Sequence, residues 1–254
     1  MRTSRFTPGM ICLGVCSEMI KVLIAAPLRQ EPRVFEEYQK GLDGLIIPDG
    51  VKADRFFVVN DCDEVIPYIR DAEYIINDSE DVTMYQEHLW TNELVSKMSV
   101  MRNQTIRKAL DGGYDYLLSV DTDLVLEEHT LEVLLAADKD IVAGLFWTEG
   151  WSNAWMYDQA AGYDPEWEKP GLYRIGGSGA LFLIKRKVLE AGVDYTQIPN
   201  LRRAVFGEDR HFCIRAVCNG FELWADSHCL PVHLYRKWDY DKYKAGELKT
   251  CFRK

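Results

Sequence analysis

The chain has 254 residues, of which 47% are hydrophobic and 12% aromatic, so it contains enough apolar material for one substantial core. Its formal net charge of −10 argues against a broad basic face and thus against nucleic acid as the main partner. The seven cysteines include no CxxC pair, which argues against zinc clusters and a disulfide framework. They indicate a reducing compartment, and we expect a cytoplasmic protein.

The first 18 residues combine a basic start with a short apolar segment. We interpret residues 1–18 as a loose extension and not as a signal peptide, because Met10–Cys16 is barely long enough and Glu18 interrupts the segment. No apolar run approaches the roughly 18 residues of a membrane span, so we expect no transmembrane segment. We place a single domain in 19–236 and a charged, aromatic C-terminal tail in 237–254.

Short apolar runs alternate with helical patterns in the first part of the domain. Buried strands are expected at 21–27, 54–61, 73–78, 114–120 and 140–147. Helices are expected from Pro32 to about residue 42, over 91–113 with Thr91 as N-cap and Gly112 as stop, and over 129–137. This alternation predicts an α/β fold with a parallel, doubly wound sheet and helices on both faces.

The pattern changes after Trp147. Residues 148–171 are rich in aromatics and turn formers, and a connection of this length is usually functional or disordered; its five aromatics argue against disorder. The later elements are expected to be a strand pair (171–177 and 179–186), a short helix, a helix (208–220) and two strands (221–226 and 230–235).

Four aspartates follow directly after expected strands: Asp61, Asp78, Asp121 and Asp123. Ligands of such sheets bind at the carboxyl ends of the strands. Asp121 and Asp123 are two residues apart, so their side chains point the same way and can converge on one hard cation. A solvated acidic pair remains an alternative. An EF-hand is excluded, because Val125 and Leu126 stand where an oxygen ligand and glycine belong.

Two further segments carry candidate chemistry. Glu208 and Asp209 open an amphipathic helix, where acids either cap the helix or place a general base near a pocket. His233, in an expected strand, is either a metal ligand or an ordinary core or surface residue.

Glycines and aromatics mark a second candidate region. The glycines (Gly176, Gly177 and Gly179) fit either a close backbone approach to a ligand or a hairpin turn. The aromatics (Trp147, Trp151, Trp155 and Tyr157) either stack on a sugar or form a small satellite core.

Taken together, these segments resemble the GT-A fold, nucleotide-sugar-dependent glycosyltransferases of the family-2-like group. The resemblance covers 19–234 and rests on four motifs in the expected order: "AAPLRQ", "MRNQTIRKALDGGYDYLLSVDTD", "IGGSGALFLIKRKVLEAG" and "GEDRHFCIRAVCNGFELWAD", closed by the histidine strand. It implies a Rossmann-like, doubly wound mixed sheet with helices on both faces. It also implies a nucleotide-binding half (19–125) and an acceptor-side half (126–236).

The resemblance further implies transfer of a hexose-type sugar from a nucleotide diphosphate donor to an acceptor hydroxyl, with Mn²⁺ or Mg²⁺. Asp209 would be the general base of an inverting reaction, and Glu208 would orient the acceptor or the helix. The implied metal ligands are Asp121, Asp123 and His233. The implied nucleotide-binding residues are Pro27, Arg29, Asp61, Arg102 and Asp121, and the acceptor would contact Trp155, Gly177 and Ser178.

Two alternatives remain open at this point. A nucleotide-sugar-forming nucleotidyltransferase would normally carry a glycine-rich basic loop after the first strand, and "APLRQEPR" contains no glycine. A non-catalytic nucleotide- or sugar-binding relative is disfavoured because all candidate acids are present. The run "PLRQ" also departs from the polar "TYNR"-like run of the family, which leaves the base contacts open. The acceptor is equally open among glycans, lipid carriers, proteins and modified nucleic acid.

Overall fold

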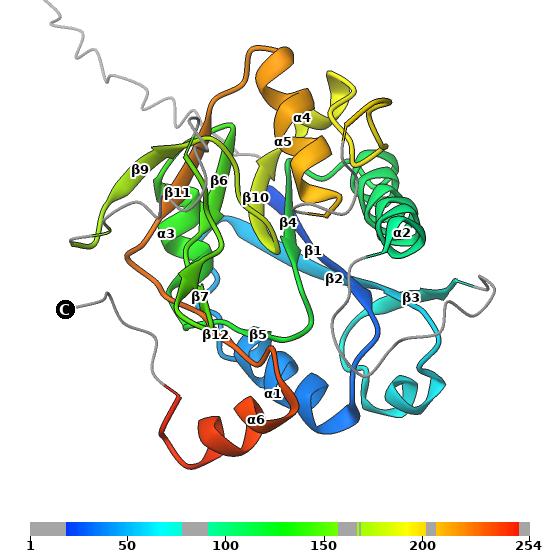
Figure 1. Ribbon diagram of the computed structural model, residues 1–254, viewed down its shortest axis with the longest axis vertical. Coiled ribbons are helices and arrows are strands. Elements are labelled where there is room, and N and C mark those ends of the chain that lie inside the picture. Colours follow the sequence, from blue (N-terminus) through cyan, green and yellow to red (C-terminus); the bar gives the residue numbers. More distant parts are fainter. Residues whose placement is uncertain (1–18, 78–90, 157–166, 168, 202–206, 249–254) are drawn as a thin grey trace, which may run out of the picture.

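The computed structural model describes residues 19–77, 91–156, 167, 169–201 and 207–248. In these residues eight strands form one mixed sheet with the order β3-β2-β1-β4-β10-β6-β11-β9 (Figure 1). The strands are β1 (Ile20–Leu28), β2 (Val51–Val59), β3 (Glu73–Ile76), β4 (Tyr116–Val120), β6 (Ile141–Gly144), β9 (Leu172–Ile175), β10 (Leu181–Lys185) and β11 (Leu223–Asp226). The predicted α/β fold with a mixed, doubly wound sheet is confirmed. The expected extension 1–18 and Asp78 lie outside the described residues.

The strands from β3 to β4 all run parallel, as the alternation of strands and helices predicts. β1 is buried over most of its length, because β2 and β4 cover its two edges and helices cover its two faces. Parallel pairing brings the carboxyl ends of β1, β2 and β4 to one edge of the sheet. Arg29, Asp61 and Asp121 follow these ends in the chain.

Helices cover both faces of the sheet (Figure 1). One face carries α2 (Asn92–Asp111), α4 (Arg186–Glu190) and α5 (Asp209–Cys218); the other carries α1 (Pro32–Asp43), α3 (Thr130–Ala136) and the 3₁₀-helix η1 (Asp63–Tyr68). Side chains alternate along β1, so Leu23 packs in the first core and Val22 in the second. The predicted cap of α2 is confirmed: the Thr91 hydroxyl accepts a hydrogen bond of 3.1 Å from the Leu94 N–H.

The second half of the sheet contains antiparallel strands. β10 lies between β4 and β6 and is antiparallel to both, so its first residue, Leu181, stands opposite Val120 at the end of β4. The expected pairing of 171–177 with 179–186 is wrong, because β9 pairs instead with β11 at the far edge. The glycine segment between β9 and β10 is therefore not a hairpin turn. Its backbone bonds to Trp155, whose carbonyl accepts from the Gly176 N–H at 2.8 Å.

Two short antiparallel pairs flank the main sheet. β5 (Leu124–Val125) pairs with β12 (Val232–His233), and β7 (Trp147–Thr148) pairs with β8 (Trp151–Ser152). Glu149 and Gly150 connect β7 to β8 with positive φ of 49° and 89°, the backbone of a tight hairpin turn.

The expected C-terminal tail includes a helix, α6 (Lys237–Lys244), that the sequence pattern did not reveal. It docks on α1 through the Lys244 ammonium, which lies 3.1 Å from the buried Glu37 carboxylate. The Arg33 guanidinium also lies 4.8 Å from the centre of the Tyr240 ring. α6 therefore fixes the end of the segment that carries β12.

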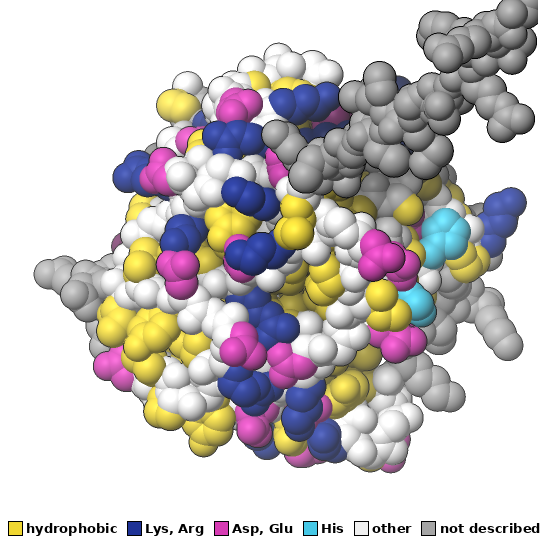
Figure 2. Space-filling view, turned by 180° about the vertical axis from the view of Figure 1, so that it is seen from behind, with side chains coloured by type: hydrophobic (Ala, Val, Ile, Leu, Met, Phe, Trp, Pro, Cys, Tyr) yellow, Lys and Arg dark blue, Asp and Glu magenta, His cyan; other side chains and the backbone are white. Residues whose placement is uncertain are grey.

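The surface seen from behind mixes Lys and Arg with Asp and Glu side chains (Figure 2). Apolar side chains gather at the lower left of Figure 2, the side to which the turn from Figure 1 brings β3. In that edge strand Tyr74, Ile75 and Ile76 are all exposed. Across the described ranges, none of the helices has both the length and the apolar character that crossing a membrane requires.

Candidate active site

The candidate site lies where the carboxyl ends of β1, β2 and β4 meet the start of β10. The antiparallel direction of β10 places the segment 176–180 beside the residues that follow β4. The Asp121 N–H donates a 2.8 Å hydrogen bond to the Ala180 carbonyl, which ties the two segments together. Ala180 has a positive φ of 68°, which is uncommon for alanine and is found preferentially at functional sites.

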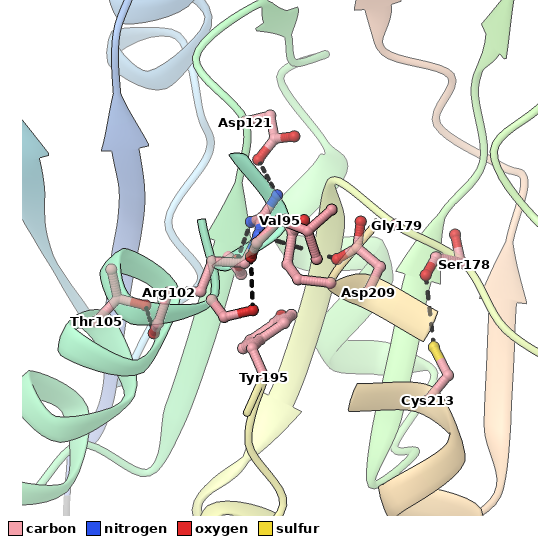
Figure 3. Close-up of polar contacts among 12 residues, drawn as sticks. Val95, Arg102, Thr105, Asp121, Ser178, Gly179, Tyr195, Asp209 and Cys213 are labelled. Carbon is pink, nitrogen blue, oxygen red and sulfur yellow. Dashed lines mark hydrogen bonds and ion pairs between the residues drawn. The ribbon is translucent and has the colours of Figure 1, made fainter. Parts of the chain in front are cut away.

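Arg102 lies at the centre of the site and is buried, with 1% of its surface exposed. Its Nε donates to Glu208 at 2.6 Å, and one terminal nitrogen donates to Asp121 at 2.7 Å. The other terminal nitrogen donates to the Ser119 hydroxyl at 3.3 Å. Figure 3 shows the guanidinium between Asp121 and Asp209, with the Tyr195 ring nearby. One buried cation from α2 thus joins β4 to the start of α5.

Asp209 is held at the first turn of α5, next to the segment 176–180. Its Oδ1 lies 4.0 Å from Nε of Arg102, and its carboxylate accepts a hydrogen bond from the Ala180 backbone. Among the described residues no hydrogen-bond donor reaches Oδ1. Its neighbour Glu208 is fully buried and bound to Arg102. Oε2 of Glu208 has no donor among the described residues either, but the Glu208 side chain is inaccessible, whereas 16% of the Asp209 side chain is exposed. Asp209 is therefore the carboxylate that a ligand can reach, and Glu208 serves the internal ion pair.

Burial and neighbouring charges raise the pKa of two carboxylates in this site. Burial raises the pKa of Asp121 to about 6, with Arg102 acting in the opposite direction and Asp123 adding to the rise. Burial also raises the pKa of Asp209 well above its usual value, again opposed by Arg102 and reinforced by Glu208 and Asp121. A carboxylate with a raised pKa holds a proton more tightly, which suits a general base.

The carboxylate of Asp123 contacts a histidine from the far end of the chain. β12 pairs with β5, and the Leu234 N–H bonds to the Asp123 carbonyl at 2.8 Å. This pairing places Nε2 of His233 3.3 Å from Oδ2 of Asp123. Nδ1 of His233 lies 2.7 Å from the Thr148 hydroxyl, which orients the ring. Burial lowers the pKa of His233, but Asp123 outweighs it, so the pKa is above its usual value.

A second polar group lies at the ends of β1 and β2. Asp61 has a positive φ of 49°, and its Oδ2 accepts from the buried Lys97 ammonium at 2.6 Å and from the Asn60 amide at 2.7 Å. Arg29 lies 3.7 Å from the same oxygen. Burial raises the pKa of Asp61, but the hydrogen bond from Lys97 outweighs it and the pKa is lowered. Pro27 is buried within β1, directly before this group.

The third group surrounds the turn 176–180. Trp155 is half-buried and forms an isolated backbone bridge with Gly177. Ser178 is fully buried, and the Asn153 amide donates to its hydroxyl at 2.9 Å and to the Gly144 carbonyl at 3.0 Å. Asn153 therefore fastens this turn to the end of β6.

Most sequence-predicted site residues thus occupy these groups. Asp121, Arg102, Glu208 and Asp209 form the central group, Asp123 and His233 form a pair, and Arg29 and Asp61 form the group beside β1. In the part of the chain that the structure describes, no three His, Cys, Asp or Glu side chains are arranged to hold a metal by themselves. Asp123 and His233 contact each other, whereas Asp121 is bound to Arg102.

Sequence reasoning missed four contributors: Lys97, Thr148, Asn153 and Ala180. Lys97 looks like a surface lysine of a helix, and the partners of Thr148 and Asn153 lie far away in the chain. Only the glycine-rich context of Ala180 carried a usable pattern, since such runs mark close backbone approaches.

Comparison with known proteins supports the fold. No protein-family model matches the chain, and no curated protein matches it in sequence. Among solved structures the chain is similar to the mannosyltransferase PcManGT from Pyrobaculum calidifontis in complex with GDP-Man and Mn²⁺, with a TM-score of 0.52 and 13% identity. The match covers 88% of this chain and 59% of that chain, so this chain spans about three fifths of the length of that protein. The chain therefore has the fold of a glycosyltransferase.

Proposed function

We propose that the protein is a metal-dependent glycosyltransferase that moves a sugar from a nucleotide diphosphate donor to an acceptor hydroxyl, with inversion. The observation that carries this proposal is the central group, in which Arg102 joins Asp121 at the end of β4 to Glu208 and Asp209 at the start of α5. The similar structure of a mannosyltransferase with GDP-Man and Mn²⁺ supports the same class of donor.

The donor nucleotide would lie along the carboxyl ends of β1, β2 and β4. Arg29 and Lys97 supply positive charge there, and Asp61 offers a carboxylate whose Oδ1 is not used by these contacts. Pro27 would lie beneath the nucleotide, and Asp121 would contact the ribose. Arg102 has its donors directed to protein groups, so it would act on the nucleotide by holding Asp121 in place.

The residues of this chain fit a divalent cation such as Mn²⁺ or Mg²⁺. The Asp123 carboxylate and the His233 imidazole would hold it, with Asp121 near by, and the donor phosphates would complete the shell. A bound cation neutralises the negative charge that develops on the leaving diphosphate. The Thr148 hydroxyl would keep Nε2 of His233 directed at the cation, as second contacts commonly do for metal-bound histidines.

Asp209 would accept the proton of the acceptor hydroxyl through its carboxylate, which is partly exposed. As that proton leaves, the acceptor oxygen forms a bond to the anomeric carbon, and the bond from this carbon to the diphosphate oxygen breaks. Glu208 would not touch the substrate. It would balance Arg102 and thereby fix the start of α5, so it is a positioning residue.

The acceptor would lie against the turn 176–180. The Trp155 indole offers an aromatic face, and Gly177 and Ser178 bring backbone groups close to it. These residues come from the second half of the chain, whereas the proposed nucleotide contacts come from the first.

Donor turnover tests the proposal. Purified protein is incubated with GDP-mannose, UDP-glucose and other nucleotide sugars, with Mn²⁺ or with a chelator, and with or without octyl glycosides as acceptors. The proposal expects nucleotide diphosphate release that needs the metal, and a glycosylated product when an acceptor is present. Binding without any turnover would indicate a non-catalytic relative, and release of pyrophosphate from a nucleoside triphosphate and a sugar phosphate would indicate a nucleotidyltransferase.

A further inference from the structure

Two glycines of the turn, Gly177 and Gly179, each make room for one different side chain of the site. A Cβ on Gly179 would lie 2.3 Å from Oδ2 and 2.9 Å from Cγ of Asp209. A Cβ on Gly177 would lie 2.3 Å from Cζ2 and 2.6 Å from Nε1 of Trp155. Neither glycine has a positive φ, so space and not backbone conformation requires glycine at both positions.

The turn itself is fastened on several sides. The buried Ser178 between the two glycines binds Asn153 through its hydroxyl, and its carbonyl accepts a 3.5 Å hydrogen bond from the Cys213 thiol (Figure 3). Ala180, which follows Gly179, accepts a hydrogen bond from the Asp121 N–H through its carbonyl. A methyl group added at either glycine is therefore not absorbed by a shift of the turn, and the side chain that it meets has to move.

We propose that the turn 176–180 positions two separate functional groups: Gly179 sets the place of the Asp209 carboxylate, and Gly177 sets the place of the Trp155 indole as a platform for the apolar face of an acceptor sugar ring. The roles of Asp209 and Trp155 rest on the proposed function. The two contacts themselves rest on the geometry of the turn. One turn thus controls turnover and acceptor binding through two independent glycines, one on each side of Ser178.

Matched alanine variants separate the two roles. With a donor that the wild type uses and octyl glycosides as the acceptor probe, Gly179→Ala is expected to lower kcat on the order of 10²-fold, the cost of a misplaced reacting group. Gly177→Ala is expected to raise the acceptor KM roughly two- to tenfold, the worth of one aromatic contact, with kcat nearly kept. Gly44→Ala is the control, because its Cβ would meet only Lys40 and Gly41 carbonyls, at 3.4 and 3.7 Å.

Melting temperatures of double variants test the two contacts independently of any activity assay. Gly179→Ala should lower the melting temperature less than half as much when Asp209 is already alanine, and by the same amount as in the wild type when Trp155 is already alanine. Gly177→Ala should lower it less than half as much when Trp155 is already alanine, and by the same amount as in the wild type when Asp209 is already alanine. This inference alone would be overturned if the losses of melting temperature simply added up in all four double variants, which combine each glycine substitution with Asp209→Ala or Trp155→Ala. It would also be overturned if Gly177→Ala and Gly179→Ala changed kcat and KM equally. A wild-type protein that neither binds nor turns over nucleotide sugars would overturn the proposed function instead.

Discussion

The two halves of the sheet contribute to the site in different ways. The parallel half, with β1, β2 and β4, presents Asp61 and Asp121 directly from strand ends, so the register of the strands fixes their positions. The second half presents Asp209 and Trp155 from a helix start and a connecting segment, and both depend on the turn 176–180. The proposed donor-binding residues are therefore fixed by the frame of the sheet, whereas the proposed acceptor side depends on a few close contacts.

Arg102 is the link between these halves. It comes from α2, and it binds Asp121 in the parallel half and Glu208 in the second half through a buried guanidinium. Removing a group from one half should therefore impair one function, whereas removing Arg102 should impair both.

The largest effect is expected at Asp123. Asp123→Ala removes the carboxylate that faces His233, so donor turnover should be abolished while the far-ultraviolet circular dichroism spectrum stays that of the wild type. Excess chelator should have the same effect on the wild type. Full activity in chelator would show that turnover needs no divalent cation and would remove the proposed role of Asp123.

The next effect is expected at Asp209. Asp209→Asn keeps the shape but not the basicity, so transfer should fall by about two to four orders of magnitude with donor affinity nearly unchanged. Because a base acts only when ionised, and the pKa of Asp209 is raised, the wild-type rate should fall with decreasing pH well above the usual range of an aspartate. The residual rate of Asp209→Asn should lack this acid limb. A near wild-type rate in the variant would assign the base to another group.

Arg102 should matter for stability more than exposed arginines do. Arg102→Met leaves Glu208 and Asp121 facing each other without their shared cation, which should cost about 3–5 kcal/mol of the free energy of unfolding. Arg174→Met is the control, because its ion pair with Glu222 is exposed and should be worth less than about 1 kcal/mol. Equal losses in urea unfolding would show that the central group is not a buried network.

Trp155 should affect only the acceptor side. Trp155→Ala is expected to weaken acceptor use while metal-dependent donor hydrolysis persists, because the proposed donor contacts come from the parallel half. Hydrolysis and transfer are measured on the same sample as the melting temperature. If both activities fall together, or if the melting temperature drops as for a core tryptophan, Trp155 serves the fold and the acceptor binds elsewhere.

The smallest effect is expected at Thr148. Thr148→Val keeps the volume but removes the hydroxyl that orients His233, so the Mn²⁺ concentration for half-maximal turnover should rise about tenfold. Thr148→Ser keeps the hydroxyl and should behave like the wild type. An unchanged metal requirement in Thr148→Val would mean that His233 does not bind the cation.

The sequence was sufficient for three strands of the parallel half, but the burial predicted for the strand at 73–78 is wrong, because β3 is an exposed edge strand. Apolar runs with intervening helical patterns determine β1, β2 and β4 and the cap of α2 at Thr91, and parallel topology then places Asp61 and Asp121 on one edge. Strand pairing in the second half could not be predicted from the sequence. The pattern of 171–186 indicates two neighbouring strands but does not reveal that β9 pairs with β11.

Long-range contacts limited the prediction of the site in the same way. Thr148 and His233 are 85 residues apart, and neither residue type alone announces the other. Lys97 lies on α2 with ordinary helical spacing, yet it is buried against Asp61. Such partners follow from how elements pack and not from their own sequence patterns.

The most direct test of the central claim is a thermal-shift panel of nucleotides and nucleotide sugars with Mn²⁺, run on the wild type and on Asp123→Ala. A ligand that binds only the native state at about 100 times its Kd stabilises it by about 2.7 kcal/mol, which is readily measured as a rise in melting temperature. The proposed function predicts that at least one nucleotide diphosphate sugar raises the melting temperature of the wild type with Mn²⁺, and that chelator or Asp123→Ala removes the rise. A panel in which no nucleotide diphosphate sugar changes the melting temperature of the wild type would contradict it.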